Sequence, residues 1–339
     1  MSPARVRRFA APALAGTAVI LLLLAFNHQP TPAPLSPASP TVQAPADGVL
    51  GPLPQPPALD PRRTALGERL FNEVRLSSDN SIACVSCHDL RHGGVDGQKV
   101  SVGVGGAKGG INAPTVFNSG LSFVQFWNGR AATLEEQAAG PIQNAAEMAS
   151  SWEIVLPRLR DDAQYRAEFA AAYSDGITST NLLDAIATFE RTLVTPDSRF
   201  DRYLQGEQSL SADEIAGYRR FRELGCTSCH QGVLLGGNMY QKFGVLRDYF
   251  RDRAPTKADL GRFDVTHREQ DRFVFKVPTL RNVALTAPYF HDGSAATLEQ
   301  AVAVMGQYQL GRDLSTADVA QVAAFLRTLT GQWRGKSLE

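Results

Sequence analysis

The cysteines of this 339-residue chain stand where they could hold a prosthetic group. All four fall in two copies of one pattern, Cys84-Val-Ser-Cys87-His88 and Cys226-Thr-Ser-Cys229-His230. Two thiols at this spacing can form thioethers with the two vinyl groups of a haem, and the adjacent histidine can then ligate the iron. A zinc site or a disulfide is the alternative for a single Cys-x-x-Cys pair. Two copies that each end in histidine favour two covalently bound haem c groups.

A related segment follows each motif, and the two segments align at a constant offset. The matching residues are Pro114-Thr115 with Pro278-Thr279, Asn118 with Asn282, Phe126 with Phe290, and Gly129-Arg-Ala-Ala-Thr-Leu-Glu135 with Gly293-Ser-Ala-Ala-Thr-Leu-Glu299. Each copy then predicts a helix that begins at a capping box, Thr133-x-x-Glu136 in the first and Thr297-x-x-Gln300 in the second. The repeat indicates a duplicated structural unit.

The two copies differ where a second ligand to iron is expected. Met305 of the second copy aligns with Pro141 of the first. Methionine sulfur can ligate haem iron, so Met305 opposite His230 would make the second haem six-coordinate and suited to electron transfer. The first haem would keep an open face for a small oxidant. At a second position that differs, Trp127 of the first copy aligns with His291 of the second. A core-packing role is the alternative for both Met305 and Trp127.

Helical domains are needed to position these residues. Helical stretches lead into both motifs, ending near Phe71 and Arg222. The expected fold class is all-α: two cytochrome c-like helical domains with a haem covalently bound in each, and long irregular loops. We place the N-terminal cytochrome domain at residues 60–205 and the C-terminal one at residues 206–335.

The N-terminus has a composition unlike that of the rest of the chain. Three arginines precede an uncharged run from Phe9 to Phe26, which predicts an export leader at residues 1–28, either a signal peptide or a membrane anchor. No cysteine follows closely, which excludes a lipoprotein. Residues 29–59 are rich in proline and predict a linker. The expected location is the periplasm, either exported or tethered to the inner membrane.

Charge points to no nucleic-acid partner. Lys+Arg and Asp+Glu are balanced at 34 each, so there is no basic surplus to bind a phosphate backbone. Apolar residues make up 43% of the chain, enough for a folded core.

Several longer motifs resemble those of the bacterial di-haem cytochrome c peroxidase family, which includes the MauG-type enzymes. The resemblance covers about residues 60–331. The motifs are Asn112-Ala-Pro-Thr-Val-Phe-Asn118, Phe126-Trp-Asn-Gly-Arg-Ala131, Glu136-Gln-Ala-Ala-Gly-Pro-Ile-Gln-Asn144, Gly236-Gly-Asn-Met-Tyr-Gln-Lys-Phe-Gly244, Val277-Pro-Thr-Leu-Arg-Asn282 and Ala287-Pro-Tyr-Phe-His-Asp-Gly293.

The resemblance implies a peroxide site at the first haem, with Glu147 and Gln137 in its pocket. Heterolytic cleavage of the O–O bond moves a proton from one oxygen to the other. A buried carboxylate such as Glu147 can do this as a general base and then as an acid. Gln137 offers a donor and an acceptor that could hold peroxide in line.

The resemblance further assigns three roles outside that pocket. It makes Trp127 the electron relay between the haems and Met305 the axial ligand of the second iron. It also suggests a calcium ion bound by the Asn112 side chain and the backbone carbonyls of Thr286 and Pro288, because calcium prefers oxygen ligands.

One departure from the family concerns the loop after the first haem motif. Many members carry there a histidine that ligates the first iron until the second haem is reduced, whereas this chain has Val104. His92 lies too close to His88 in sequence to replace it well. The MauG-type enzymes also lack the histidine, but a tyrosine ligates their second iron. This chain keeps Met305, with Tyr308 nearby.

The leading interpretation is therefore a cytochrome c peroxidase. It would reduce hydrogen peroxide to water with electrons from a small cytochrome c or a cupredoxin. The alternatives are a MauG-type oxidase that modifies a partner protein and a plain electron carrier. A homodimer is one expectation for the assembly.

Overall fold

The computed structural model describes residues 48–338, all of which belong to one compact unit, Val42–Glu339. The expected leader and the first part of the expected linker lie outside the described residues. Within residues 48–338, no helix has the length and apolar character needed to cross a membrane.

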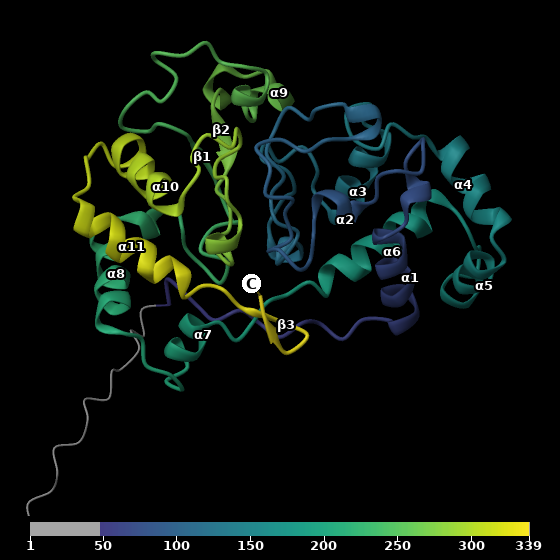
Figure 1. The fold of residues 1–339 in the computed structure, drawn as a ribbon, viewed down its shortest axis with the longest axis horizontal. Helices are drawn as coiled ribbons and strands as arrows, with labels where there is room; N and C mark the ends of the chain where they lie inside the picture. The colour runs from purple at the N-terminus through teal and green to yellow at the C-terminus, as the bar shows by residue number, and fades with distance from the viewer. Residues whose placement is uncertain (1–47, 339) are drawn as a thin grey trace, which may run out of the picture. The chain divides into compact units, whose positions relative to one another are not determined.

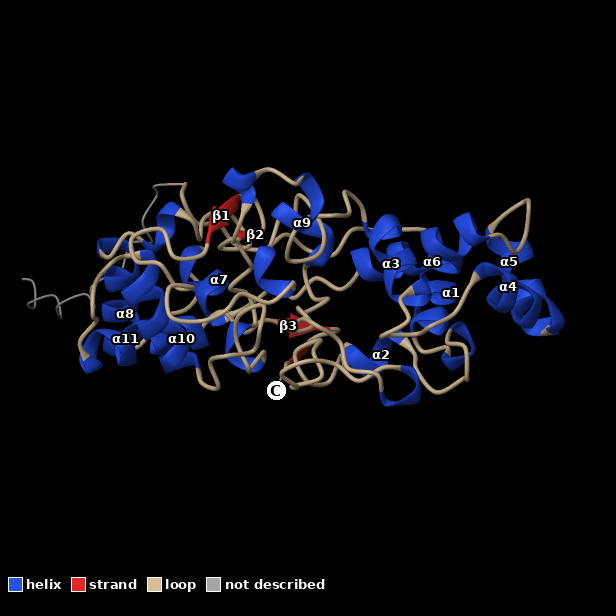
Figure 2. Cartoon of the chain, turned by 90° about the horizontal axis from the view of Figure 1, so that it is seen from above, coloured by secondary structure: helices blue, strands red, loops and turns tan. Residues whose placement is uncertain are grey.

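Eleven α-helices and four short strands form the regular structure of the described residues. The helices are α1 (Pro61–Phe71), α2 (Cys84–Cys87), α3 (Leu134–Gln143), α4 (Trp152–Asp161), α5 (Ala163–Ala172), α6 (Ser179–Arg191), α7 (Arg199–Leu204), α8 (Ala212–Glu223), α9 (Phe263–Thr266), α10 (Leu298–Val304) and α11 (Thr316–Arg327). The strands are β1 (Tyr240–Lys242), β2 (Val274–Lys276), β3 (Gln332–Trp333) and β4 (Lys336–Ser337); β1 pairs antiparallel with β2, and β3 with β4. Long irregular segments connect them (Figure 2). The expectation of a mostly helical fold with long loops is confirmed, with four short strands added.

The two helices after the repeated segments begin as their sequences predict. At the start of α10, the Thr297 hydroxyl accepts a hydrogen bond from the Gln300 backbone N–H at 3.2 Å. The Gln300 side-chain oxygen accepts one from the Thr297 backbone N–H at 3.3 Å. In α3, Thr133 accepts from the Glu136 N–H in the same way, but the Glu136 carboxylate accepts from the N–H of Ala132 instead. Only the second capping box is therefore complete.

The compact unit consists of two halves, the first carrying α1 to α6 and the second carrying α7 to α11, and each half is built on a close pair of helices. α1 packs against α6 in the first half, and α8 packs against α11 in the second (Figure 1). Glycines allow both approaches. A Cβ on Gly67 would lie 1.9 Å from the carbonyl oxygen of Ala185, and a Cβ on Gly217 would lie 1.9 Å from that of Gln321. The duplication therefore extends to the helices around the haem motifs.

The C-terminal ends of α6 and α11 also repeat one another. Their sequences are Phe189-Glu-Arg-Thr-Leu193 and Phe325-Leu-Arg-Thr-Leu329. Arg191 bonds Glu135 on α3 at 2.6 Å, and Arg327 bonds Glu299 on α10 in the corresponding place. The same ion pair thus joins equivalent helices in both halves.

A buried polar junction joins the halves at Thr195. The aligned residues Asn118 and Asn282 each donate a side-chain hydrogen bond to the Thr195 hydroxyl oxygen, both at 2.9 Å. The side-chain Oδ1 of Asn118 accepts from the Thr195 N–H at 2.9 Å, and the side-chain Oδ1 of Asn282 accepts from the Gly331 N–H at 3.0 Å. Both asparagines and Thr195 are at most 1% exposed. The junction is therefore a fully paired polar contact inside the core.

Packing of the described chain begins before residue 60. Leu50 and Leu53 are buried, and Leu50 belongs to the core of the second half. The Leu53 N–H donates to Asp201 at 3.2 Å, and the fully buried Arg281 bonds the same carboxylate at 2.7 Å. Arg281 also donates to the carbonyl of Gly51 at 2.8 Å. The end of the expected linker is thus anchored to the second half.

The C-terminal segment, in turn, packs against the first half. Trp333 on β3 makes an edge contact with Phe117 of the first half, with ring centroids 5.8 Å apart. Leu338 is buried in the same cluster as Phe71 and Phe117. Each end of the described chain therefore packs on the half to which it does not belong in sequence.

We expect Gly217→Ala to destabilise the protein by about 1–3 kcal/mol, the usual scale of overpacking, because the clash is with backbone and exceeds the helix-propensity gain of about 1 kcal/mol. Gly110→Ala is the matched control, since Gly110 is exposed with nothing within 4 Å of its added Cβ. Thermal unfolding of the holoprotein measures both variants. Equal unfolding temperatures for the two would contradict a close α8–α11 contact.

Candidate functional site

The first motif forms a short helix with its histidine at the end. The Ser86 hydroxyl accepts from the N–H of Ala83 at 3.0 Å, and the His88 N–H donates to the Cys84 carbonyl at 3.0 Å. The His88 Nδ1 donates to the carbonyl of Gly94 at 3.2 Å. This bond leaves Nε2 without a proton and available to a metal. Burial lowers the pKa of His88, which favours the neutral, ligating form.

The second motif repeats this geometry. The His230 N–H donates to the Cys226 carbonyl at 2.9 Å, and its Nδ1 donates to the carbonyl of Leu235 at 2.9 Å. Burial lowers the pKa of His230 as well. Both histidines are therefore held in the tautomer that presents Nε2.

These residues fit haem better than zinc or a disulfide. None of the four cysteines is in a disulfide. In the described part of the chain, three or more potential metal-ligating side chains converge only at Asp259, His291 and Asp292, away from both motifs. The motif side chains therefore do not gather around one point as zinc ligands do. Side-by-side cysteines with a histidine held for axial ligation are what haem c requires.

One cavity joins the first motif to residues far along the chain. Its lining includes Cys84, Cys87 and His88 of the motif, Gln137 and Pro141 of α3, Glu147 in the turn after α3, and Ile186 and Glu190 of α6. The structure thus brings both expected pocket residues to the first motif. It also places Pro141 in the same cavity.

Glu147 is a half-buried carboxyl group in the lining of this cavity. Its side chain accepts a hydrogen bond from the Asn144 amide at 2.6 Å. Burial raises the pKa of Glu147, while the bond from Asn144 and the charge of Arg130 oppose the rise. A carboxyl whose pKa is moved toward neutrality can both take and give a proton at working pH.

The loop that carries Val104 lies against the Glu147 turn. The Val104 N–H donates to the Glu147 carbonyl at 2.8 Å. A Cβ on Gly103 would lie 2.4 Å from the same carbonyl oxygen, so only glycine allows this approach. His92 is bonded to Asp89 at 2.9 Å and is mostly exposed. His92 therefore lies outside the cavity.

Met305 begins a π-helical turn, Met305–Gln309, directly after α10. Such turns are frequent at functional sites. Met305 packs against the aromatic cluster Phe243, Phe250 and Phe275, and Trp127 packs against the same cluster. Tyr308, by contrast, makes an edge contact with Tyr249, with centroids 4.9 Å apart.

Trp127 reaches from the first half into the second. Its indole N–H donates to the carbonyl of Asn112 at 2.9 Å, and its backbone carbonyl accepts from the Lys276 N–H at 2.8 Å. The Trp127 ring lies 6.4 Å from that of His291, edge to face. The two aligned residues of the repeat are therefore in contact with each other.

A buried charge cluster surrounds His291, and sequence reasoning missed it. His291 bonds Asp259 at 2.7 Å, and Arg253 bonds Asp259 at 2.9 Å and Asp292 at 2.8 Å. Burial lowers the pKa of His291, opposed by Asp259. Arg253 supplies the cation for both carboxylates. The alignment of His291 with Trp127 was the only signal in the sequence for this cluster.

Asn112 is a buried link between the halves. Its backbone N–H donates to the carbonyl of His291 at 2.8 Å, and its side-chain amide donates to the carbonyl of Gln98 at 2.9 Å. His291 follows Thr286 and Pro288 closely in the chain. The three expected calcium ligands therefore come from two adjoining segments.

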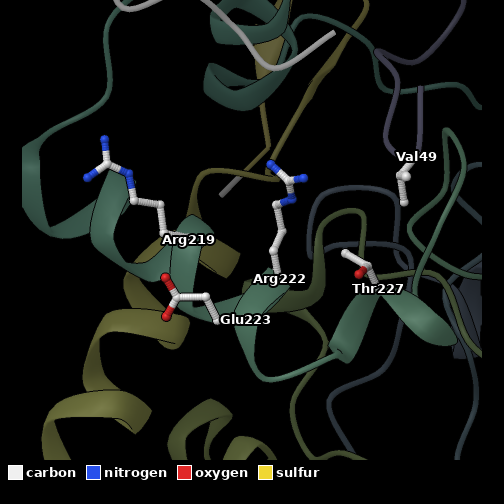
Figure 3. A pocket seen from close by; sticks show the side chains of 5 residues that line it. All are labelled: Val49, Arg219, Arg222, Glu223 and Thr227. Carbon is white, nitrogen blue, oxygen red and sulfur yellow. The ribbon is translucent and has the colours of Figure 1, made fainter. Parts of the chain in front are cut away.

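A surface pocket lies beside the second motif. Figure 3 shows its lining side chains, Val49, Arg219, Arg222, Glu223 and Thr227. Thr227 is part of the motif, and the charged residues come from the C-terminal part of α8. This pocket contains none of the expected site residues.

Comparisons with known proteins agree with this geometry. The family described as di-haem cytochrome c peroxidase matches residues 61–209. The cytochrome c551 peroxidase of Nitrosomonas europaea is 51% identical, with 78% of this chain and 79% of the relative covered. The cytochrome c peroxidase Ccp of Escherichia coli is 49% identical over 83% of this chain, but this chain spans only 60% of its length.

More distant matches carry the MauG name. The solved structure of a MauG-like protein associated with microbial copper homeostasis is 31% identical, with a TM-score of 0.74, and covers 83% of this chain and 94% of that one. The two cytochrome c peroxidases named above, at 49–51% identity, are thus more similar to this chain than this MauG-like protein is. The family resemblance in the motifs is confirmed: the chain belongs to the di-haem cytochrome c peroxidase family.

Proposed function

We propose that this chain reduces hydrogen peroxide to two waters, using two electrons from a small cytochrome c or a cupredoxin and two protons. The observation that carries the proposal is the cavity that joins Cys84, Cys87 and His88 to Gln137 and Glu147. An attachment site for a redox cofactor and a half-buried carboxyl group that can transfer a proton share one space. A plain electron carrier needs no such group.

The two motifs would each hold a haem c through two thioethers and one histidine. When bound, the haem iron supplies the site that binds an oxygen of peroxide and delivers electrons to it. Glu147 takes the proton of the bound peroxide and returns it to the departing oxygen. Asn144 holds the Glu147 carboxylate in place, and Gln137 orients the peroxide.

Electrons would enter at the second site and pass through Trp127. His230 and Met305 would hold the second iron. The contacts of Trp127 with Asn112, His291 and the cluster around Met305 support a relay position between the halves.

A calcium ion would bind at the Asn112 side chain and the carbonyls of Thr286 and Pro288. The Asn112 side-chain oxygen suits this hard cation, as do backbone carbonyls. The bond from the Asn112 amide to Gln98 supports a fixed orientation of that side chain.

The MauG-type alternative has less support. It would use a tyrosine on the second iron, whereas Met305 is retained and Tyr308 packs on Tyr249. For the whole protein, we propose export to the periplasm through the leader at residues 1–28, either cleaved or kept as an anchor. The two cytochrome domains at 60–205 and 206–335 and a homodimeric assembly are further proposals.

Glu147→Gln should reduce steady-state peroxide turnover by about 10²- to 10⁴-fold, the usual contribution of a general acid–base group, while leaving both haem spectra nearly unchanged. In the wild type, turnover should rise with pH through the raised pKa of Glu147, because the carboxylate is the active base. The variant should lose this rise. Glu153→Gln, on the exposed face of α4, is the control. Near-normal turnover of Glu147→Gln would remove Glu147 from the mechanism.

Met305→Leu and Met305→His should both lower the midpoint potential of the C-terminal haem, because a thioether ligand favours the ferrous state. Redox titration of the purified holoprotein measures this. Met148→Leu changes a buried methionine of the first half and should leave that potential unchanged. An unaltered potential in both Met305 variants would mean that Met305 only packs against its aromatic neighbours.

The fully oxidised protein should show a high-spin ferric signal in electron paramagnetic resonance and react with peroxide on first mixing. The reason is that Pro141 and Val104 stand where a sixth ligand would be expected. Val104→His should restore a closing ligand, so this variant should be low-spin and need prior reduction. His92→Ala should behave as the wild type. Two low-spin signals in the wild type would overturn the open first site.

A further inference from the structure

Glu190 is a buried acid that the proposed mechanism does not use. It lies near the end of α6, is 5% exposed and lines the same cavity as Cys84, His88 and Glu147. One of its carboxyl oxygens, Oε2, is buried and has no hydrogen-bond partner among the described residues. An unpaired buried carboxylate is costly, so such a group is held as the neutral acid unless a nearby charge stabilises it.

The second half has no acid at the equivalent place. In the aligned ends of α6 and α11, Glu190 corresponds to Leu326, which is buried in the core of the second half. The acid therefore belongs to the first cavity alone. It is a third difference between the copies, after Pro141 against Met305 and Trp127 against His291.

The neighbours of Glu190 leave its charge uncompensated. Arg191, the adjacent cation, is bonded to Glu135 on α3 at 2.6 Å. Cys84 on α2 lies close to Glu190, and as a haem thioether it would carry no ionisable thiol. α1, which packs against α6, contributes the apolar residues Leu66 and Leu70 to the core there. His88 and Glu147 are the other titratable groups that line the cavity.

Burial raises the pKa of Glu190 to about 8; Glu135 adds to the rise and Arg191 opposes it. A ferric porphyrin core carries one net positive charge, and a ferrous core carries none. The positive charge favours the carboxylate, so the pKa is lower in the oxidised site than in the reduced one. Proton exchange on reduction is therefore expected in a window that extends below about pH 8, near neutrality.

We propose that Glu190 is a redox-linked proton carrier of the first haem cavity. Its carboxylate takes up one solvent proton when an electron from the donor protein lowers the positive charge of the site, at whichever oxidation level the site starts. When peroxide oxidises the site, the carboxyl gives that proton to a peroxide-derived oxygen. This supplies one of the two protons that two waters require, so the inference rests on the proposed function.

The test is the midpoint potential of the first haem, measured by spectroelectrochemical titration of the holoprotein over a series of pH values. In the wild type, the potential should fall as pH rises, with a slope approaching about 59 mV per tenfold change in proton activity, the one-electron equivalent. Glu190→Gln should flatten this slope. Glu190→Leu, which installs the residue of the second half, should do the same. Glu153→Gln should keep the wild-type slope.

A second readout does not depend on the potential. Redox-difference infrared spectroscopy of the wild type should show a protonated carboxyl band that appears on reduction and is absent in Glu190→Gln. A pH-independent wild-type potential, or a slope that persists in Glu190→Gln, would overturn the proposal. Glu147→Gln separates the proposed peroxide reduction from the proposed role of Glu190. This variant should lose peroxide turnover but keep the pH dependence of the midpoint potential. Absence of peroxide turnover in a wild type that shows the slope would count against the proposed function alone.

Discussion

The buried contact of Asn118 and Asn282 with Thr195 determines how the two halves of this protein meet. A hydroxyl oxygen has two lone pairs, and Thr195 uses them to accept one amide from each half. Leaving either amide unpaired in the core would cost about 1–3 kcal/mol, so the halves are held in a single register. That register brings Trp127 into contact with His291 and places Asn112 on the His291 backbone.

The duplicated framework is nearly the same in both halves, and its function comes from the places where it differs. The helix pairs, the Arg–Glu ion pairs and the histidine-to-carbonyl bonds are repeated. The first cavity has Pro141 and Glu190 where the second half has Met305 and Leu326. One half therefore combines a cavity at the first motif with two carboxyl groups in its lining, and the other has a methionine and an apolar leucine at the aligned places. The proposed peroxide reduction would use the former, and the proposed electron entry the latter.

The neighbourhood of Trp127 shows how charge is kept close to the proposed electron path without being left unpaired. Asp259 and Asp292 are compensated by Arg253, and His291 is oriented by its bond to Asp259. Buried charges are tolerated when they are paired and hydrogen-bonded in this way. The crossing of the chain ends, with Leu50 in one half and Leu338 in the other, adds apolar contacts that hold the same arrangement.

The attachment motifs, the duplication and the mostly helical fold could be predicted from the residues, because each rests on short spacings or on local capping. Glu147 and Gln137 were predicted only through the family resemblance, since nothing in their local sequence distinguishes them from solvated helix residues. The burial of Glu190, the cluster around His291 and the anchoring of residues 50–53 could not be predicted. Each depends on contacts between segments far apart in the chain, and a residue's type does not reveal whether folding will remove its charge from water.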